Sequence, residues 1–275
     1  MRRLCYGMLV LLALPCFAAE PSGEQEWLQF KQDFAQLAGG PTGMYAIKNM
    51  IELSPGATAQ LPAGVTVKFH DNRALTSGPG IQSTDLLQLK GESLPLGNGL
   101  AVKATLREKK LKVWLYDAKL PEQRKFQALD YFPYDPKGRI TAAFRRNEKP
   151  IAVSYLDSRE QAGTMYEVGV IDAVIDGKPQ KLKTFSYRND WKDIDALLLL
   201  LRDRTSGKTT YGGGRVVEIT IPKGAPPPTI TFDLNMAYSF LCAHSEFYNC
   251  PLVLTNRLDA DLNYGEKYPP KMSGE

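Results

Sequence analysis

The sequence predicts a mainly β protein, a single domain of about a dozen short strands preceded by one amphipathic helix. Three observations support this prediction. Short runs of alternating, β-branched or aromatic residues recur along the chain, turns containing Gly, Pro and charged residues separate them, and helical periodicity occurs in one stretch. This pattern is typical of two packed sheets or a partly closed barrel, and periodicity does not distinguish between the two.

The first residues are typical of a secretory signal peptide. Two arginines precede an apolar run over residues 4–17, and two alanines then precede an acidic, polar stretch. Cleavage after Ala18 leaves small side chains at the positions that the signal peptidase reads. We therefore expect residues 1–18 to be removed and the mature protein to be periplasmic or secreted.

The helix is expected within residues 19–40. Ser22 and Gln25 have the spacing of a capping box, and two glycines followed by Pro41 end the pattern. The apolar side chains that recur at helical spacing between these signals are Trp27, Phe30, Phe34 and Leu37. The polar face lacks the Lys and Arg enrichment of a membrane-surface helix, so we expect the aromatic face to dock onto the sheet.

Residues 41–275 are expected to form the β domain. The predicted strands are 44–53, 65–70, 86–90, 100–106, 111–116, 140–145, 151–155, 165–175, 181–187, 196–202, 216–221 and 229–234. Tight hairpins are predicted at 107–110 and 176–178. The segment 130–139 combines prolines, a glycine and aromatic rings, and is expected to be a structured loop that closes one end of the sheet.

The apolar runs and the charges exclude two classes of protein. The longest apolar run after the signal peptide, residues 196–201, falls far short of the roughly 20 residues that cross a bilayer. Lys and Arg total 34, Asp and Glu total 30, and the two signs are interleaved along the chain. The sequence therefore predicts neither a transmembrane segment nor a nucleic-acid-binding surface.

Three consecutive glycines, Gly212 to Gly214, lie in the polar segment 205–215. A phosphate loop of the Walker type ends in Gly-Lys-Ser/Thr and leads into a helix, whereas a strand-like run follows here. We therefore expect the glycines to form a bulge or to admit a neighbouring backbone.

The segment 231–257 concentrates polar and reactive side chains. Cys242 and Cys250 are close together in a chain expected to be exported, so we expect a disulfide, which loop closure makes worth roughly 2.6 kcal/mol. The alternative is a Cys242 thiolate activated by His244. Because His70 is far away and no pair of zinc-ligand spacings appears, no metal or cofactor is predicted.

Three functions compete for these side chains. The first is a binding or accessory module for a small polar or anionic ligand, and the second is a hydrolase-like enzyme with His244 or Asp233 as base, for which no nucleophile elbow is present. The third is a structural lock in which Arg215 and Arg257 pair with Asp233 and Glu266. The ligand-binding candidates are Tyr211, Arg215, Asp233, Asn235, Tyr238, His244, Asn256, Arg257 and Glu266.

The C-terminal half also carries a specific set of motifs. They are DRTSGKTTYGGGR at 203–215, DLNMAY at 233–238, Cys242-Ala243, Tyr248 with CPL at 250–252, NRL at 256–258 and GEK at 265–267. Together, over residues 130–267, they resemble the bacterial family called domain of unknown function 1684. The chain departs from the family at Leu234, where an aromatic residue is usual, and at Ser239-Phe240, where Asn-Pro is usual. The family has no assigned reaction, so the resemblance implies where the site lies and leaves its chemistry open.

Overall fold

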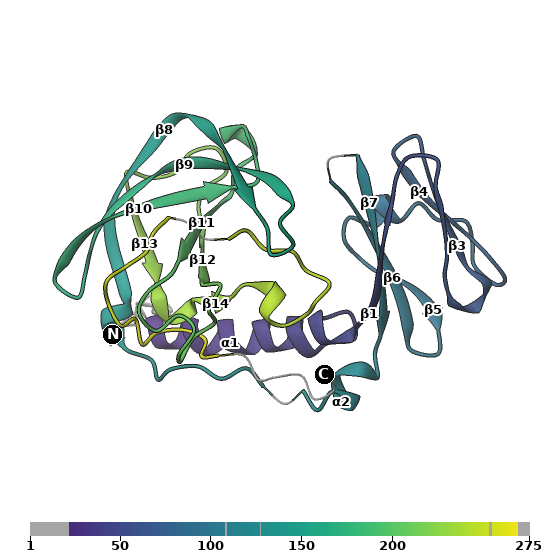
Figure 1. Ribbon diagram of the computed structural model, residues 1–275, viewed down its shortest axis with the longest axis horizontal. Coiled ribbons are helices and arrows are strands. Elements are labelled where there is room, and N and C mark those ends of the chain that lie inside the picture. The colour runs from purple at the N-terminus through teal and green to yellow at the C-terminus, as the bar shows by residue number, and fades with distance from the viewer. Residues whose placement is uncertain (1–21, 108, 127, 253–254, 269–275) are drawn as a thin grey trace, which may run out of the picture.

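The computed structural model describes residues 22–268, except 108, 127 and 253–254. The predicted signal peptide, residues 1–18, lies outside the described residues. The chain forms two β lobes that lie side by side, strands β1–β7 in one and β8–β14 in the other (Figure 1). Helix α1 runs along one edge of the second lobe toward β1 (Figure 1). This architecture confirms the predicted mainly β class.

The N-terminal lobe consists of two antiparallel sheets, in the orders β1-β7-β6-β5 and β2-β3-β4. Their strands are β1 (Ile47–Leu53), β2 (Thr58–Gln60), β3 (Thr66–His70), β4 (Arg73–Ser77), β5 (Leu94–Gly97), β6 (Leu100–Arg107) and β7 (Lys110–Asp117). Val67 and Phe69 of one sheet share a hydrophobic core with Leu111 and Val113 of the other. The lobe is therefore a pair of packed sheets, one of the two arrangements that periodicity left open.

The C-terminal lobe is one antiparallel seven-stranded sheet, in the order β13-β8-β9-β10-β11-β12-β14. Its strands are β8 (Arg139–Leu156), β9 (Ala162–Ile175), β10 (Lys178–Ser186), β11 (Ala196–Leu201), β12 (Arg215–Thr220), β13 (Thr229–Asp233) and β14 (Tyr238–Ser239). The sheet curls around its core, because Val217 of β12 and Phe232 of β13 belong to the same buried cluster. The strand order begins at β13 and ends at β14, so the sheet is not a closed barrel.

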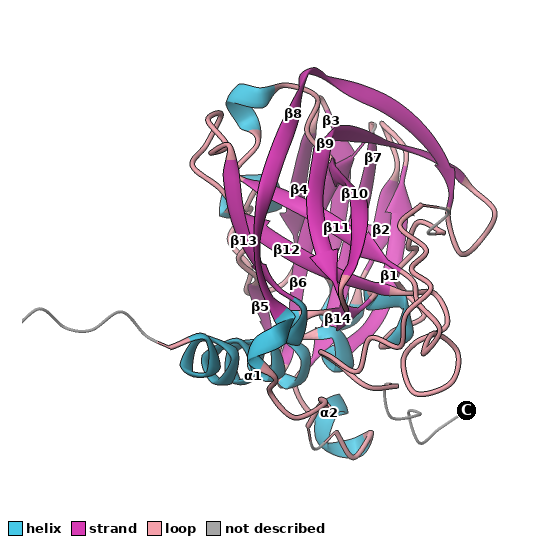
Figure 2. Cartoon of the chain, turned by 90° about the vertical axis from the view of Figure 1, so that its left-hand side faces the viewer, coloured by secondary structure: helices cyan, strands magenta, loops and turns pink. Residues whose placement is uncertain are grey.

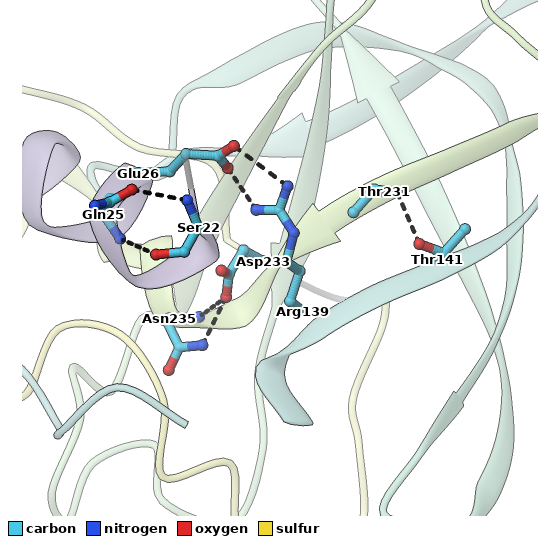
Figure 3. Close-up of polar contacts among 8 residues, drawn as sticks. All are labelled: Ser22, Gln25, Glu26, Arg139, Thr141, Thr231, Asp233 and Asn235. Atoms are coloured by element: carbon cyan, nitrogen blue, oxygen red, sulfur yellow. Dashed lines mark hydrogen bonds and ion pairs between the residues drawn. The ribbon is translucent and has the colours of Figure 1, made fainter. Parts of the chain in front are cut away.

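Helix α1 (Gly23–Gly39) begins where the capping box predicts. The backbone N–H of Gln25 donates to Ser22 Oγ at 3.3 Å, and Ser22 N–H donates to Gln25 Oε1 at 2.9 Å (Figure 3). A second, short helix, α2 (Leu120–Gln123), precedes the passage into the C-terminal lobe. Figure 2 shows both helices at one end of the sheets.

The aromatic face of α1 docks onto the C-terminal lobe, as predicted. Trp27 and Phe34 are buried, and the Phe34 ring centroid lies 4.8 Å from that of Tyr238 in β14. An ion pair between Glu26 and Arg139 of β8 fixes the start of the helix (Figure 3). Leu37 is 61% exposed, so this residue does not belong to the buried face.

The strand predictions differ from the structure in several places, and residues 44–46, predicted as part of a strand, form a 3₁₀ turn. Residues 86–89 form a 3₁₀ turn, because Asp85 Oδ1 accepts the N–H of Leu87 at 3.2 Å and Lys90 takes a left-handed φ of 50°. The runs 140–145 and 151–155 join into the single strand β8, which passes a register shift against β9 between Arg146 and Ile151. Strands β2, β4, β5 and β14 were not predicted, since two to five residues give too short a run for a periodic signal.

The segment 130–139 is a structured loop, and its partner is the end of the described chain. Phe132 N–H donates to the carbonyl of Gly265 at 2.9 Å, and Lys267 N–H donates to the carbonyl of Asp130 at 2.9 Å. The two hairpins also form, with Arg107 opposite Lys110 and Ile175 opposite Lys178. Among the described residues, no helix is long and apolar enough to span a bilayer.

The docking of α1 makes a prediction about stability. Phe34→Ala removes a buried ring, so it should lower the free energy of unfolding by about 3–5 kcal/mol. Leu28→Ala, on the same helix but 50% exposed, should change it by less than about 0.5 kcal/mol. Urea denaturation of both variants checks this, and equal effects would show that α1 is not docked.

Candidate functional site

The largest fully buried side chain among the described residues is that of Arg215, at the start of β12. Its Nη2 lies 2.7 Å from Asp203 Oδ2, and both side chains are almost completely buried. The guanidinium also donates to the carbonyl of Leu262 at 3.0 Å and to the carbonyl of Tyr264. Burial lowers the pKa of Arg215, and the charge of Asp203 opposes that shift. The arginine therefore joins β12 to the C-terminal segment.

The turn between residues 203 and 215 is shaped to hold this carboxylate. Asp203 Oδ1 accepts the N–H of Thr205 at 2.8 Å, and Thr205 Oγ1 lies 2.9 Å from Thr210 Oγ1. Gly214 has a φ of +108°, and a Cβ at this position would lie 2.5 Å from the carbonyl oxygen of Leu201. The predicted close approach of another backbone is therefore confirmed at Gly214.

A second buried polar group consists of Tyr45, His244 and Glu266. His244 Nδ1 lies 3.2 Å from Tyr45 Oη, and Nε2 lies 3.2 Å from Glu266 Oε1, without the alignment of a hydrogen bond. Glu266 Oε2 accepts the N–H of Ser239 at 2.7 Å. Burial, with the charge of Glu266 as a smaller cause, raises the pKa of Tyr45 to about 12. This group connects the C-terminal lobe to the segment that enters β1.

The same three side chains resemble a general-base arrangement, in which a carboxylate orients an imidazole. The side chains of His244 and Glu266 are fully buried, however, so no substrate reaches them in this conformation. Both ring nitrogens of His244 also face Tyr45 and Glu266, which leaves neither for the thiol of Cys242.

The predicted disulfide is not formed, because Cys242 and Cys250 are both free thiols. Residues 241–243 make a 3₁₀ turn that aims the N–H of Cys242 at the Cys250 sulfur, 3.2 Å away. A side-chain contact between the two thiols lowers the pKa of Cys242 to about 7. The same thiol–thiol contact, together with burial, raises the pKa of Cys250, whereas the backbone N–H of Cys242 acts to lower it. The Tyr211 hydroxyl lies 3.8 Å from Cys242 Sγ.

Asp233 and Asn235 form a third buried group, at the end of β13 (Figure 3). Asp233 Oδ1 accepts the N–H of Asn235 at 2.8 Å and its Nδ2 at 2.7 Å. Asn235 Nδ2 also donates to the carbonyl of Asp135 at 2.8 Å, and its Oδ1 accepts the Asp135 N–H at 3.1 Å. Burial raises the pKa of Asp233, against the hydrogen bonds from Asn235 and the charge of Arg139. These contacts tie β13 to the loop before β8.

The remaining candidates do not converge on these groups. Tyr238 packs against α1, and Asn256 binds backbone atoms of Lys183 and Leu200 through its amide. Arg257 is exposed at the surface. The structure thus distributes the nine candidates over separate places. The predicted lock residues do not pair with one another, since the partner of Arg215 is Asp203.

A cleft of about 580 Å³ lies between the two lobes. Its walls come from β6 and β7 on one side and from the region of β10, β11 and the loop 247–249 on the other. The lining residues are Thr105, Leu106, Arg107, Lys112, Trp114, Ser186, Tyr187, Arg188, Asp195, Ala196, Leu198, Phe247, Tyr248 and Asn249. Sequence reasoning missed this cleft, because its lining comes from segments far apart along the chain.

Cation–π and aromatic contacts cross between the lobes at this cleft. The guanidinium of Arg107 lies 4.6 Å from the ring centroid of Tyr187, and the Trp114 and Tyr248 ring centroids are 5.2 Å apart. The cleft therefore has basic groups and flat rings on both walls. The described part of the chain contains no cluster of His, Cys, Asp and Glu that could hold a metal ion.

Comparisons with known proteins relate the chain to a family and to a solved structure. The family described as Protein of unknown function (DUF1684) matches residues 124–267, just over half of the chain. A solution NMR structure of an uncharacterized protein from Haloarcula marismortui is 30% identical, with a TM-score of 0.44, and the match covers 53% of this chain and 79% of that one. None of the curated proteins compared with the chain matches it.

The buried carboxyl group of Asp233 makes a prediction about pH. Its pKa is raised in the folded state, so the stability it contributes is fully present below its unfolded pKa of about 3.9 and is lost as the pH rises through the folded pKa. Asp233→Asn keeps the acceptor for Asn235 and cannot ionise. The stability of this variant relative to the wild type should therefore increase from about pH 3 to pH 7.

Asp190→Asn is the matched control, because Asp190 also caps a 3₁₀ turn but its side chain is 48% exposed. Hydrogen bonds from the backbone and side chain of Lys192 lower the pKa of Asp190, so this variant should lose relative stability over the same pH range. Urea denaturation at a series of pH values measures the unfolding free energy of both variants relative to the wild type. If this difference changed with pH in the same direction for both variants, the raised pKa assigned to Asp233 would be contradicted.

Proposed function

The chain belongs to the family of proteins of unknown function DUF1684, and we propose that it is an exported binding protein whose ligand, a small anionic molecule, occupies the cleft between its two β lobes. The observation that carries this proposal is the composition of the cleft. Arg107, Lys112 and Arg188 line it, and Asp195 is the one acidic side chain among its described lining residues. A negatively charged ligand complements this surface.

The rings of the cleft support a ligand with a flat or apolar part. Trp114, Tyr187, Phe247 and Tyr248 line the same space as the basic groups. Ligand sites are typically concave and aromatic, with a few polar groups that fix orientation. The indole N–H of Trp114 already donates to Thr105 Oγ1 at 3.0 Å, so the ring is held in place before any ligand binds. We infer an anionic group together with a planar body.

Binding is favoured over catalysis because the candidate acidic and basic side chains are engaged in contacts within the fold. Asp203 neutralises Arg215, Asp233 caps a turn, and Glu266 and His244 face each other away from solvent. The residues that suggested a hydrolase are thus committed to the fold. The proposed export is supported by the N-terminal residues 1–18, whose composition is typical of a signal peptide, and it corresponds to a periplasmic or secreted protein.

Fluorescence titration of the full-length mature protein with benzoate and citrate tests the proposal. Trp114 lines the cleft, so an anion that binds there should change the tryptophan emission, and Trp114→Phe should remove most of that change. Arg188→Gln should weaken binding at least about tenfold, the loss expected for a hydrogen bond to a charged group.

Lys208→Gln is the matched control, because Lys208 is an exposed cation that does not line the cleft. It should leave the titration unchanged. If Arg188→Gln binds as tightly as the wild type, or if neither anion changes the emission, the cleft is not a site for an anion of this kind.

A further inference from the structure

We propose that Arg202 and Arg257 form a separate anion site on the C-terminal lobe and that this site takes a phosphate group in its doubly charged form. The two residues line a surface cavity of about 310 Å³ together with Asp203, Arg204, Leu258 and Asp259. Arg202 follows the last residue of β11, and none of the described residues that line this cavity also lines the interlobe cleft. The site is therefore distinct from the cleft and does not depend on it.

The backbone places the two arginines side by side. Arg202 and Arg257 form a parallel β-bridge, in which Arg202 N–H donates to the carbonyl of Asn256 at 3.1 Å and Leu258 N–H donates to the carbonyl of Arg202 at 2.8 Å. Paired residues on neighbouring strands lie about 4.8 Å apart. Two guanidinium groups thus start from adjacent positions at the wall of one cavity.

The positions of both arginines are fixed by their neighbours. Asn256 has a left-handed φ of 51°, and its amide binds the backbone of Lys183 twice and the carbonyl of Leu200. The stem of Arg202 lies so close to Gly214 that a Cβ at that glycine would meet Arg202 Cγ at 2.9 Å. The site is therefore pre-organised, which reduces the entropy lost on binding.

The carboxylates around the cavity already form ion pairs with other arginines. Asp203 pairs with Arg215 at 2.7 Å, and Asp259 and Asp261 pair with Arg204 at 3.3 and 3.0 Å. Within the described chain no acidic side chain pairs with Arg202 or Arg257, although the backbone holds them together. Like charges at this separation repel each other, and an anion bound between them removes the repulsion.

The charge of the site selects the class of anion. Two guanidinium forks offer paired N–H donors, which match the oxygens of carboxylate and phosphate groups. A carboxylate carries one negative charge, whereas a phosphate group carries about 1.5 to 2 at neutral pH. A phosphate therefore neutralises both arginines, and we expect the site to prefer it to acetate.

Isothermal titration calorimetry of the full-length mature protein with inorganic phosphate tests this site, at an ionic strength kept constant with NaCl. We expect saturable binding to the wild type that is tighter than that of acetate. Arg257→Gln and Arg202→Gln should each weaken phosphate binding at least about tenfold. Lys208→Gln, at an exposed cation outside both sites, and Arg188→Gln, in the cleft, should bind phosphate as the wild type does.

Arg257 is exposed, so Arg257→Gln is expected to keep the melting temperature of the wild type in NaCl, which shows that a loss of binding is local. Three results would each overturn the proposal: no heat beyond that of the NaCl control, equal phosphate affinity in Arg257→Gln and the wild type, or acetate binding as tightly as phosphate. Loss of phosphate binding in Arg188→Gln alone would assign the anion to the cleft instead.

Discussion

The buried ion pair between Arg215 and Asp203 is the contact on which the arrangement of the C-terminal lobe depends. One guanidinium joins the start of β12, the turn 203–215 and the carbonyls of Leu262 and Tyr264. Two residues further on, Glu266 holds the N–H of Ser239 in β14 and faces His244, which in turn contacts Tyr45 before β1. The chain of contacts therefore runs from the core of the C-terminal lobe to the segment just before β1, the first strand of the N-terminal lobe. It also anchors the segment that leads to the cleft wall at residues 247–249.

Burying this ion pair costs desolvation free energy, and removing one of its partners lowers the stability of the fold. Removing a guanidinium and a carboxylate from water carries a large desolvation penalty, which their attraction and the added hydrogen bonds must offset. Arg215 offsets this desolvation penalty with the ion pair to Asp203 and with hydrogen bonds to two backbone carbonyls, although its Nε has no partner. Loss of either residue leaves the other charge buried without a counter-charge, which strongly destabilises the fold. The intact pair itself adds little net stability, because the desolvation penalty offsets the attraction, and its main effect is to hold β12 and the C-terminal segment in one arrangement. The polar residues that look most like an active site are, for this reason, parts of the fold.

Much of the fold was predictable, because its signals are local. The capping residues of α1, the alternation in β9 to β12 and the hairpin at 176–178 depend on near neighbours in the chain. The partner of Arg215 was not predictable, since a turn with three glycines gives no rule for where the Asp203 side chain points. The cysteine spacing suited a disulfide, but the 3₁₀ turn at 241–243 made the sulfur of Cys250 an acceptor. The cleft left no local signal, because Trp114 and Tyr248 meet only after the two lobes pack together.

The central claim, that Arg215 is a structural residue and not a ligand-binding one, is tested most directly by a double-mutant cycle in the absence of any ligand. Asp203→Asn, Arg215→Met and the double variant are compared with the wild type by urea denaturation. If the buried pair is structural, each single variant loses about 3–5 kcal/mol of unfolding free energy, and the double variant loses no more than either one. Single variants as stable as the wild type, or losses that simply add, would contradict the claim and return Arg215 to the ligand-binding residues.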